Sequence, residues 1–122
     1  MGFSQGGSLA LLMGALQRQR GGAIAAGVPP IKFLWIQSAR LPRDPSCEGL
    51  FDAPLALPTF VCFNDDDTNV KPREAHELIA KLDAPTVVQR PKGGHAVMNV
   101  HQRPADGQAL ASFLKPLQQQ LF

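Results

Sequence analysis

The sequence predicts an α/β fold with parallel strands, and two observations lead to this prediction. Short segments rich in β-branched and aromatic residues alternate with segments in which apolar residues recur at helical spacing. The strand-like segments are apolar almost throughout, which is typical of strands covered by helices on both faces. With 122 residues the chain is at most one domain, so residues 1–122 are expected to form a single unit.

The predicted elements follow one another in a regular order. An apolar helix, buried on more than one side, is expected from residue 5 to about residue 20, where Gly21-Gly22 is a plausible stop. Four prolines and the lack of periodicity between residues 39 and 58 predict a loop or lid. The expected strands are residues 31–36, 59–63 and 86–89, and the further helices are residues 72–82 and about 104–120.

Composition and charge exclude several classes of function. The net charge is +2 and the basic residues are scattered, so no nucleic-acid binding is expected. The apolar residues 8–16 are too few to cross a bilayer and are followed by arginines, so no membrane span is expected. Cys47 and Cys62 lie far apart in the sequence, which argues against a disulfide scaffold and against a zinc site. We therefore expect free thiols, no cofactor or metal, and a cytoplasmic protein.

The first residues carry the strongest chemical motif. Gly2-Phe3-Ser4-Gln5-Gly6 matches the Gly-x-Ser-x-Gly pattern of a nucleophile elbow, in which a sharp strand-to-helix turn lifts a serine above a sheet. The serine backbone is strained in such a turn, and a β-carbon at Gly2 or Gly6 is expected to collide with its surroundings. The backbone N–H of Gln5 would stand at a helix N-terminus and is the candidate oxyanion donor. On its own, the motif is equally compatible with a flexible glycine-rich N-terminus.

An acidic run and a histidine follow the two later strands. Because functional groups gather at the carboxyl ends of parallel strands, these side chains are expected to meet Ser4 there. The chain order serine, acid, histidine is that of α/β-hydrolases, with His95 as general base and a carboxylate that orients it. His76, in a predicted helix, and His101, beside another, are weaker candidates for the base. The residues alone leave the acid open among Asp65, Asp66 and Asp67.

Four segments of the chain resemble the FSH-type serine hydrolases of the α/β-hydrolase superfamily. The resemblance implies a truncated α/β-hydrolase fold with about three parallel strands, and it places the catalytic acid on Asp67. Asn64, Ala39-Arg40 and Met98 depart from the family pattern. The four segments are the elbow GFSQGG (residues 2–7), the strand end IQSARLPRDP (residues 36–45), the acid strand (residues 58–72) and the histidine loop GGH (residues 93–95).

The resemblance also implies the reaction. It is hydrolysis of a small-molecule carboxylic ester or thioester through an acyl-enzyme on Ser4, with His95 as base and acid and Asp67 as the residue that orients it. The acyl-protein thioesterase and carboxylesterase group shares the GFSQGG elbow and is an alternative, although it lacks the PRDP segment.

The chain begins one residue before the elbow, whereas family members carry half of the sheet before it. The resemblance therefore implies that the N-terminal half is absent, together with the loop that supplies a second oxyanion N–H. A competing hypothesis is a catalytically inactive remnant that only associates with partners. Because the elbow strand is reduced to at most three residues, residues 31–36 are expected to form an exposed apolar edge through which the chain self-associates.

Overall fold

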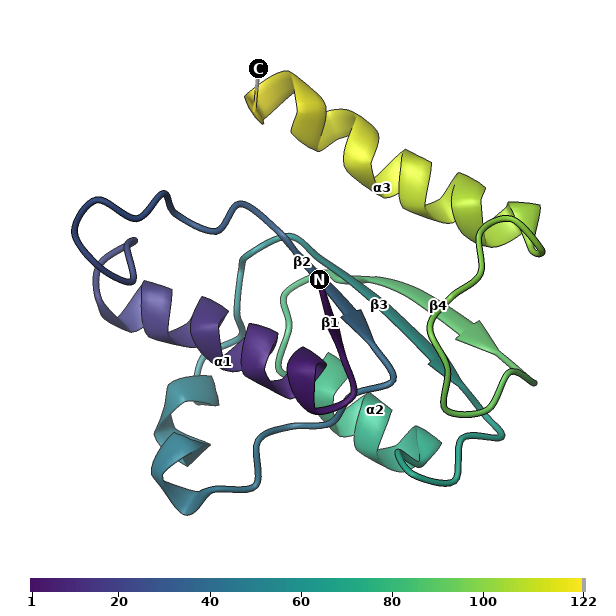
Figure 1. Cartoon of the computed structure of the whole chain (residues 1–122). Coiled ribbons are helices and arrows are strands. Elements are labelled where there is room, and N and C mark those ends of the chain that lie inside the picture. Colours follow the sequence, from purple (N-terminus) through teal and green to yellow (C-terminus); the bar gives the residue numbers. More distant parts are fainter. Residues whose placement is uncertain (122) are drawn as a thin grey trace.

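The computed structural model describes residues 1–121, which form a parallel β-sheet between two layers of helices (Figure 1). The α/β fold predicted from the sequence is thus confirmed. None of the helices in this range combines the length and apolar character needed to cross a bilayer. The elements in chain order are β1 (Gly2–Phe3), α1 (Gln5–Gln19), β2 (Leu34–Gln37), the 3₁₀ helix η1 (Pro45–Phe51), β3 (Thr59–Asn64), α2 (Pro72–Ile79), β4 (Thr86–Arg90) and α3 (Pro104–Leu121).

The sheet has four strands in the order β1-β2-β3-β4, and each pairs in parallel with the next. The expected number, about three, was too low because a two-residue strand shows no periodicity in the sequence. In β1, Gly2 pairs with Ile36 and Phe3 pairs with Gln37. The site residues follow the carboxyl ends of these strands.

The prediction that residues 31–36 form an unpaired edge was wrong. The strand there is β2, which lies between β1 and β3. All four residues of β2 pair with β3, and Ile36 and Gln37 pair with β1 as well. Among the described residues, this leaves Leu34 and Trp35 without a partner on the β1 side. The exposed backbone on that side is therefore shorter than the sequence suggested.

β2 also begins at Leu34 rather than at residue 31, because a side chain of α1 engages the preceding backbone. The Ile31 N–H donates to Gln17 Oε1 at 2.6 Å, and Gln17 Nε2 donates to the Ile31 carbonyl at 3.0 Å. Both polar backbone groups of Ile31 are satisfied in this way, so neither is available to a neighbouring strand.

Two other predictions on elements need correction. The segment between residues 39 and 58 is not only a loop, because η1 forms where Asp44 accepts a hydrogen bond from the Ser46 N–H at 2.9 Å. Helix α1 is not buried on several sides: Leu9 is 56% and Met13 39% exposed, while Leu11 and Ala15 face the core. The remaining boundaries differ from the predicted ones by a few residues, most at α2, which ends at Ile79.

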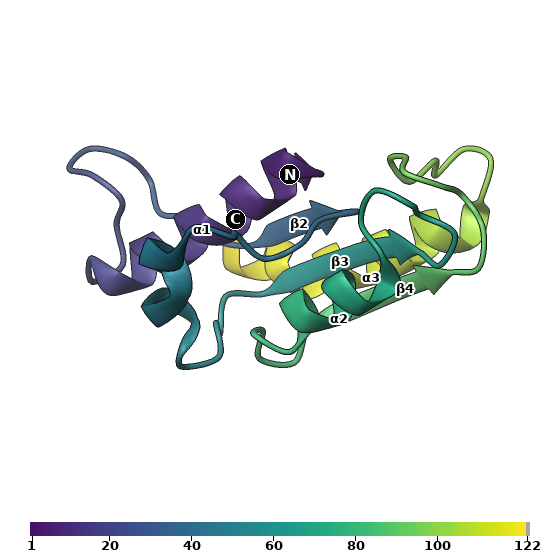
Figure 2. The ribbon, with the colours of Figure 1, turned by 90° about the horizontal axis from the view of Figure 1, so that it is seen from below.

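The two central strands, β2 and β3, each contribute side chains to two apolar layers, because successive side chains point to opposite faces of the sheet. On β3, Val61 packs in the layer under α1 and α2 with Leu11 and Leu78. Phe60 and Cys62 pack in the other layer, under α3. Figure 2 shows α3 along the face of the sheet opposite to α2. The burial of both faces explains why the strand sequences are almost continuously apolar.

Helix α3 is also joined to the sheet by a buried ion pair. Arg90 Nη1 lies 2.6 Å from Asp106 Oδ2, and their side chains are only 10% and 7% exposed. The guanidinium Nε also donates to Asn64 Oδ1 at 3.0 Å. A buried charge with a partner and further hydrogen bonds is tolerated, whereas one that loses its partner is strongly destabilising.

We expect Asp106→Asn to lower the free energy of unfolding by about 3–5 kcal/mol, because it leaves the Arg90 guanidinium buried without a counter-charge. Urea denaturation would measure the change. The control is Glu77→Gln, which removes an exposed pair with Arg73 at 3.9 Å and is expected to change stability by less than about 1 kcal/mol. If the two substitutions lowered stability equally, the inference that this ion pair anchors α3 would be contradicted.

Candidate active site

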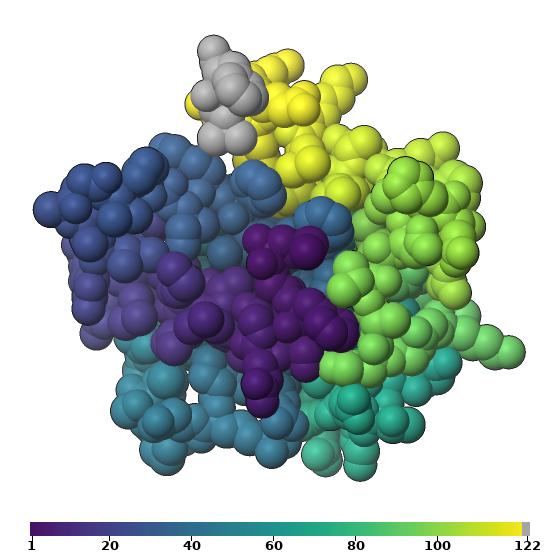
Figure 3. Space-filling view, viewed as in Figure 1, coloured from purple at the N-terminus to yellow at the C-terminus, as the bar shows by residue number. Residues whose placement is uncertain are grey.

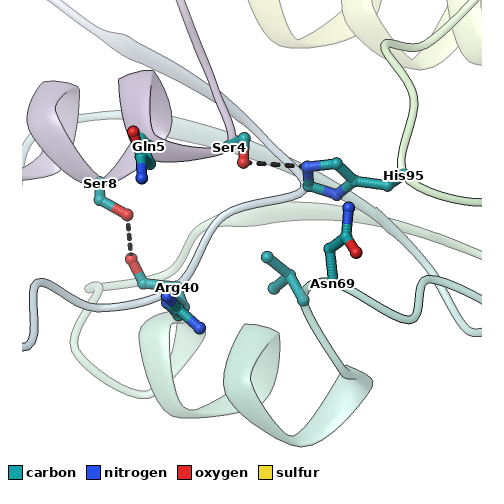
Figure 4. A pocket seen from close by; sticks show the side chains of 7 residues that line it. Ser4, Gln5, Ser8, Arg40, Asn69 and His95 are labelled. Carbon is teal, nitrogen blue, oxygen red and sulfur yellow. Dashed lines mark hydrogen bonds between the residues drawn. The ribbon is translucent and has the colours of Figure 1, made fainter.

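Side chains from distant parts of the chain meet at the carboxyl-terminal edge of the sheet. His95 Nε2 lies 2.9 Å from Ser4 Oγ, and His95 Nδ1 lies 2.8 Å from Asp67 Oδ2. Both distances are those of hydrogen bonds. Figure 4 shows the His95 ring directed at the Ser4 hydroxyl from the loop after β4. The structure therefore brings Ser4, His95 and Asp67 into one chain of hydrogen bonds.

Ser4 stands in a sharp turn between β1 and α1. Its φ of 54° and ψ of −122° are unusual for a residue with a side chain, and such a conformation costs on the order of 1–3 kcal/mol. Hydrogen bonds on both sides stabilise it. The Ser4 N–H donates to the Gln37 carbonyl at 2.9 Å, and the Ser4 carbonyl accepts from the N–H groups of Gly7 and Ser8 at 2.9 and 3.2 Å.

The glycines of this turn are not equivalent. A β-carbon at Gly2 would lie 2.2 Å from the Gly6 carbonyl oxygen, so this position requires glycine. The expectation that Gly6 is similarly restricted was wrong, because a β-carbon there would meet nothing within 4 Å. The second close approach is at Gly7, where a β-carbon would lie 2.5 Å from Ala39 Cβ. The Gly-x-Ser-x-Gly pattern thus marks one restricted glycine and misses another.

We expect Gly6→Ala to raise the free energy of unfolding by up to about 1 kcal/mol, because alanine is the better helix former and the site is open. Gly2→Ala is the matched substitution and is expected to destabilise the chain, since the backbone of α1 must move to admit the methyl group. Thermal or urea unfolding of the two variants would measure whether each substitution raises or lowers the free energy of unfolding. A destabilised Gly6→Ala together with a neutral Gly2→Ala would show that the close approach in this turn lies at the second glycine and not at the first.

The three consecutive aspartates have different partners. Asp65 accepts a hydrogen bond from Gln89 Nε2 at 2.7 Å and remains exposed. Asp67 is the one that reaches His95, and its side chain is 1% exposed. Its other oxygen accepts from the N–H groups of Asn69 and Val70 at 2.8 and 2.9 Å. The carboxylate is thereby fixed in position relative to the imidazole.

Asp66 holds the loop that carries His95. It accepts from the Gly94 N–H at 2.7 Å and from the Gly93 N–H at 3.3 Å. The hydrogen bond from Gly94 is the main cause that lowers the pKa of the Asp66 carboxyl. A lowered pKa means that this clamp favours folding at neutral pH and is lost as the pH falls through the lowered value. The sequence pointed to the acidic run but did not indicate this role.

The His95 ring is shielded as well as hydrogen-bonded. The Phe3 ring lies beside it, with ring centroids 4.9 Å apart, and the His95 side chain is 19% exposed. In the space-filling view the purple N-terminal segment lies at the surface beside light-green residues of the later chain (Figure 3). Phe3 was not predicted as part of the site, although its position just before Ser4 could have indicated it.

A pocket of about 140 Å³ opens in front of Ser4 (Figure 4). Its lining is mainly polar, and within it the Ser8 hydroxyl donates to the Arg40 carbonyl at 2.6 Å. Gln5 is the first residue of α1, where backbone N–H groups have no intrahelical acceptor and attract negative charge. The lining residues are Ser4, Gln5, Ser8, Arg40, Asn69, Val70 and His95.

Arg40, at one side of this pocket, shares a carboxylate with a second arginine. Glu74 Oε1 accepts from Arg40 at 3.3 Å and from Arg43 at 2.9 Å, while Glu74 Oε2 accepts from the Lys71 N–H at 3.0 Å. The backbone hydrogen bond from Lys71 is the main cause of the lowered pKa of Glu74. In the part of the chain that the structure describes, no group of three His, Cys, Asp or Glu side chains could hold a metal ion.

A parallel sheet whose carboxyl-terminal edge carries a hydrogen-bonded serine and histidine is the arrangement of α/β-hydrolases. The chain belongs to the serine hydrolase (FSH1) family, whose model matches residues 1–103. The resemblance to FSH-type hydrolases, predicted from four segments, is thereby confirmed. The residues matched by the family model include every residue that lines the pocket.

A curated relative agrees with this family. The esterase OVCA2 of Bos taurus is 31% identical to the chain over 120 residues, which make up 98% of this chain and 48% of the relative. The chain thus spans about half the length of that relative. The family is one of serine hydrolases, and this relative is named an esterase.

Proposed function

We propose that this chain hydrolyses a carboxylic ester or thioester through an acyl-enzyme on Ser4. The observation that carries the proposal is the chain of hydrogen bonds from Ser4 Oγ through His95 to Asp67, at 2.9 and 2.8 Å. In this proposal the three residues act as a catalytic triad and the turn at Ser4 is a nucleophile elbow. The family and the esterase relative support it.

The geometry supports the following steps. His95 Nε2 takes the hydroxyl proton while Ser4 Oγ attacks the substrate carbonyl carbon, and Asp67 stabilises the imidazolium that results. The tetrahedral intermediate collapses to the acyl-enzyme as the C–O or C–S bond breaks, and His95 gives its proton to the departing alcohol or thiol. Water then attacks the acyl-enzyme, with His95 again as base, and releases the acid and free Ser4.

The proposed oxyanion donor is the backbone N–H of Gln5, at the start of α1. In α/β-hydrolases a second oxyanion N–H comes from a loop after an earlier strand. We propose no such second donor among residues 1–121. Removal of one donor typically lowers the rate by about 10²–10³-fold. A covalent probe of the nucleophile is therefore a more sensitive first test than turnover.

We expect a fluorophosphonate probe to add to Ser4 alone, because Ser4 is the serine that lies in hydrogen-bond reach of His95. Ser4→Ala should abolish the adduct, and Ser8→Ala should retain it, since the Ser8 hydroxyl donates to a backbone carbonyl instead. Intact-mass spectrometry followed by peptide mapping would measure both. An adduct that persists in Ser4→Ala would overturn the proposed nucleophile.

The same assay distinguishes the aspartates. Asp67→Asn is expected to slow labelling strongly, because the amide no longer stabilises the imidazolium; such a change lowers kcat by about 10⁴-fold in a well-studied serine protease. Asp65→Asn is the matched control, since Asp65 contacts Gln89 and not His95. Similar rates for the two variants would contradict the role proposed for Asp67.

We also propose that copies of the chain associate through the β1 side of the sheet. β1 is only two residues long, Leu34 and Trp35 have no described partner on that side, and the nearby helix exposes Leu9 and Met13. Exposed apolar surface beside unpaired strand backbone favours association between chains. The proposed partners of the chain are therefore a small-molecule ester or thioester substrate and a second copy of the chain.

Size-exclusion chromatography with light scattering at micromolar concentration is expected to show an assembly larger than a monomer. Met13→Lys should shift it toward the monomer, because the new charge lies on the exposed face of α1. The control is Val87→Lys on β4, the opposite edge, where Val87 is 40% exposed. A monomeric chain, or an assembly that only Val87→Lys disrupts, would contradict association through the β1 side.

The cytoplasmic location expected from the sequence stays a proposal. It is supported by Cys47 and Cys62, which are both free thiols. Burial is the main cause that raises the pKa of Cys62, so its thiol is a poor nucleophile and behaves as part of the core.

A further inference from the structure

Gln37, the last residue of β2, touches both halves of the candidate site. Its backbone carbonyl accepts the Ser4 N–H at 2.9 Å. Its side-chain Oε1 accepts the Met98 N–H, also at 2.9 Å, in the segment that follows His95. Gln37 is 0% exposed, so these contacts are made in the interior and not in water.

The loop of His95 has no regular secondary structure, so side chains from the strand ends decide where it lies. Before His95, Asp66 accepts from the N–H groups of Gly93 and Gly94, and Asn64 Nδ2 donates to the Gly94 carbonyl at 2.7 Å. After His95, the short hydrogen bond is the one from the Met98 N–H to Gln37. The contact between Ser38 Oγ and the Ala96 carbonyl is longer, at 3.5 Å.

The Gln37 amide is costly for the fold. Its Nε2 is buried and has no hydrogen-bond partner among the described residues, and an unsatisfied buried donor lowers stability. The amide cannot be turned round to satisfy it, because Nε2 would then face the Met98 N–H, donor against donor. An apolar side chain of the same length would avoid the unpaired donor but would lose the hydrogen bond to Met98.

We propose that Gln37 is a positioning residue, which fixes the distance between Ser4 and His95 by holding the backbone of one and the loop of the other. The proposal rests on the proposed hydrolase function. Gln37 does not line the pocket at Ser4, and the ring nitrogens of His95 bond to Ser4 and Asp67 instead. Its effect reaches the reaction through the Ser4–His95 hydrogen bond, because a displacement of residues 96–98 moves the imidazole away from the hydroxyl.

The test compares two buried glutamines in the full chain. Gln37→Met leaves the buried Met98 N–H without its acceptor but also removes the unpaired Nε2 donor. Because these two effects on stability oppose each other, the urea midpoint is expected to change little. The maximal rate of fluorophosphonate labelling at Ser4 is expected to fall by about 10²-fold, the size of effect produced by a misplacement of about 1 Å. The probe concentration at half-maximal rate should change little, since the pocket lining is intact.

Gln17→Met is the matched control, because Gln17 is also buried and also bonds to backbone, but at Ile31 and away from Ser4. It should lower the urea midpoint and leave the labelling rate unchanged. In Gln37→Glu, burial favours the neutral carboxyl, which keeps an oxygen acceptor for the Met98 N–H. This variant should recover most of the rate lost in Gln37→Met.

Three outcomes would contradict the positioning role. They are an unchanged labelling rate in Gln37→Met, a loss of rate that only follows the loss of stability, or a rate in Gln37→Glu as low as in Gln37→Met. A wild-type chain that is not labelled at Ser4 would instead overturn the proposed function, and the positioning role with it.

Discussion

The geometry of the site depends on the pairing of β1 with β2. This pairing consists of two residue pairs, Gly2 with Ile36 and Phe3 with Gln37, and the hydrogen bond from the Ser4 N–H to the Gln37 carbonyl continues it by one residue. Because β2 is itself paired with β3 and β3 with β4, this short contact sets Ser4 in register with the loops after β3 and β4. Helix α1 packs on the same sheet and holds the turn from the other side.

Several polar side chains are buried around this point. Gln37, Asn64, Asp67, Arg90 and Asp106 are all buried near the carboxyl ends of the strands. Gln37, Asn64 and Asp67 bond to irregular segments that no backbone ladder supports. Arg90 and Asp106 join the end of β4 to α3. A buried polar group without a partner costs stability, and Gln37 carries such a group, its Nε2. The apolar layers stabilise the fold, and this polar group of residues positions the loops.

Much of this could be predicted from the sequence, because the relevant signals are local. Continuous apolar runs indicated parallel strands covered on both faces, and the order of serine, acid and histidine indicated where the side chains would gather. The choice of Asp67 over its neighbours did not come from spacing. It came from resemblance to a family, since three consecutive aspartates in a turn have no periodicity that separates them.

The features that could not be predicted arise from contacts between distant residues. The start of β2 depends on Gln17 binding Ile31, and nothing in either segment alone shows it. The close approach at Gly7 depends on where Ala39 lies after folding, whereas a β-carbon at Gly6 would meet nothing within 4 Å. The two contacts of Gln37 involve Ser4 and Met98, which lie far apart in the sequence. Such contacts exist only once the sheet has formed.

The buried pair of Arg90 and Asp106 links α3 to the loop that carries His95. Helix α3 lies beyond residue 103, the last one that the family model matches, and none of the side chains described for it lines the pocket at Ser4. Yet Asp106 contacts Arg90, Arg90 contacts Asn64, and Asn64 contacts the Gly94 carbonyl next to His95. A helix outside the shared family region is thus linked by three consecutive hydrogen bonds to the histidine loop. Relatives that differ in this helix can therefore differ in the rigidity of that loop while their pocket residues stay the same.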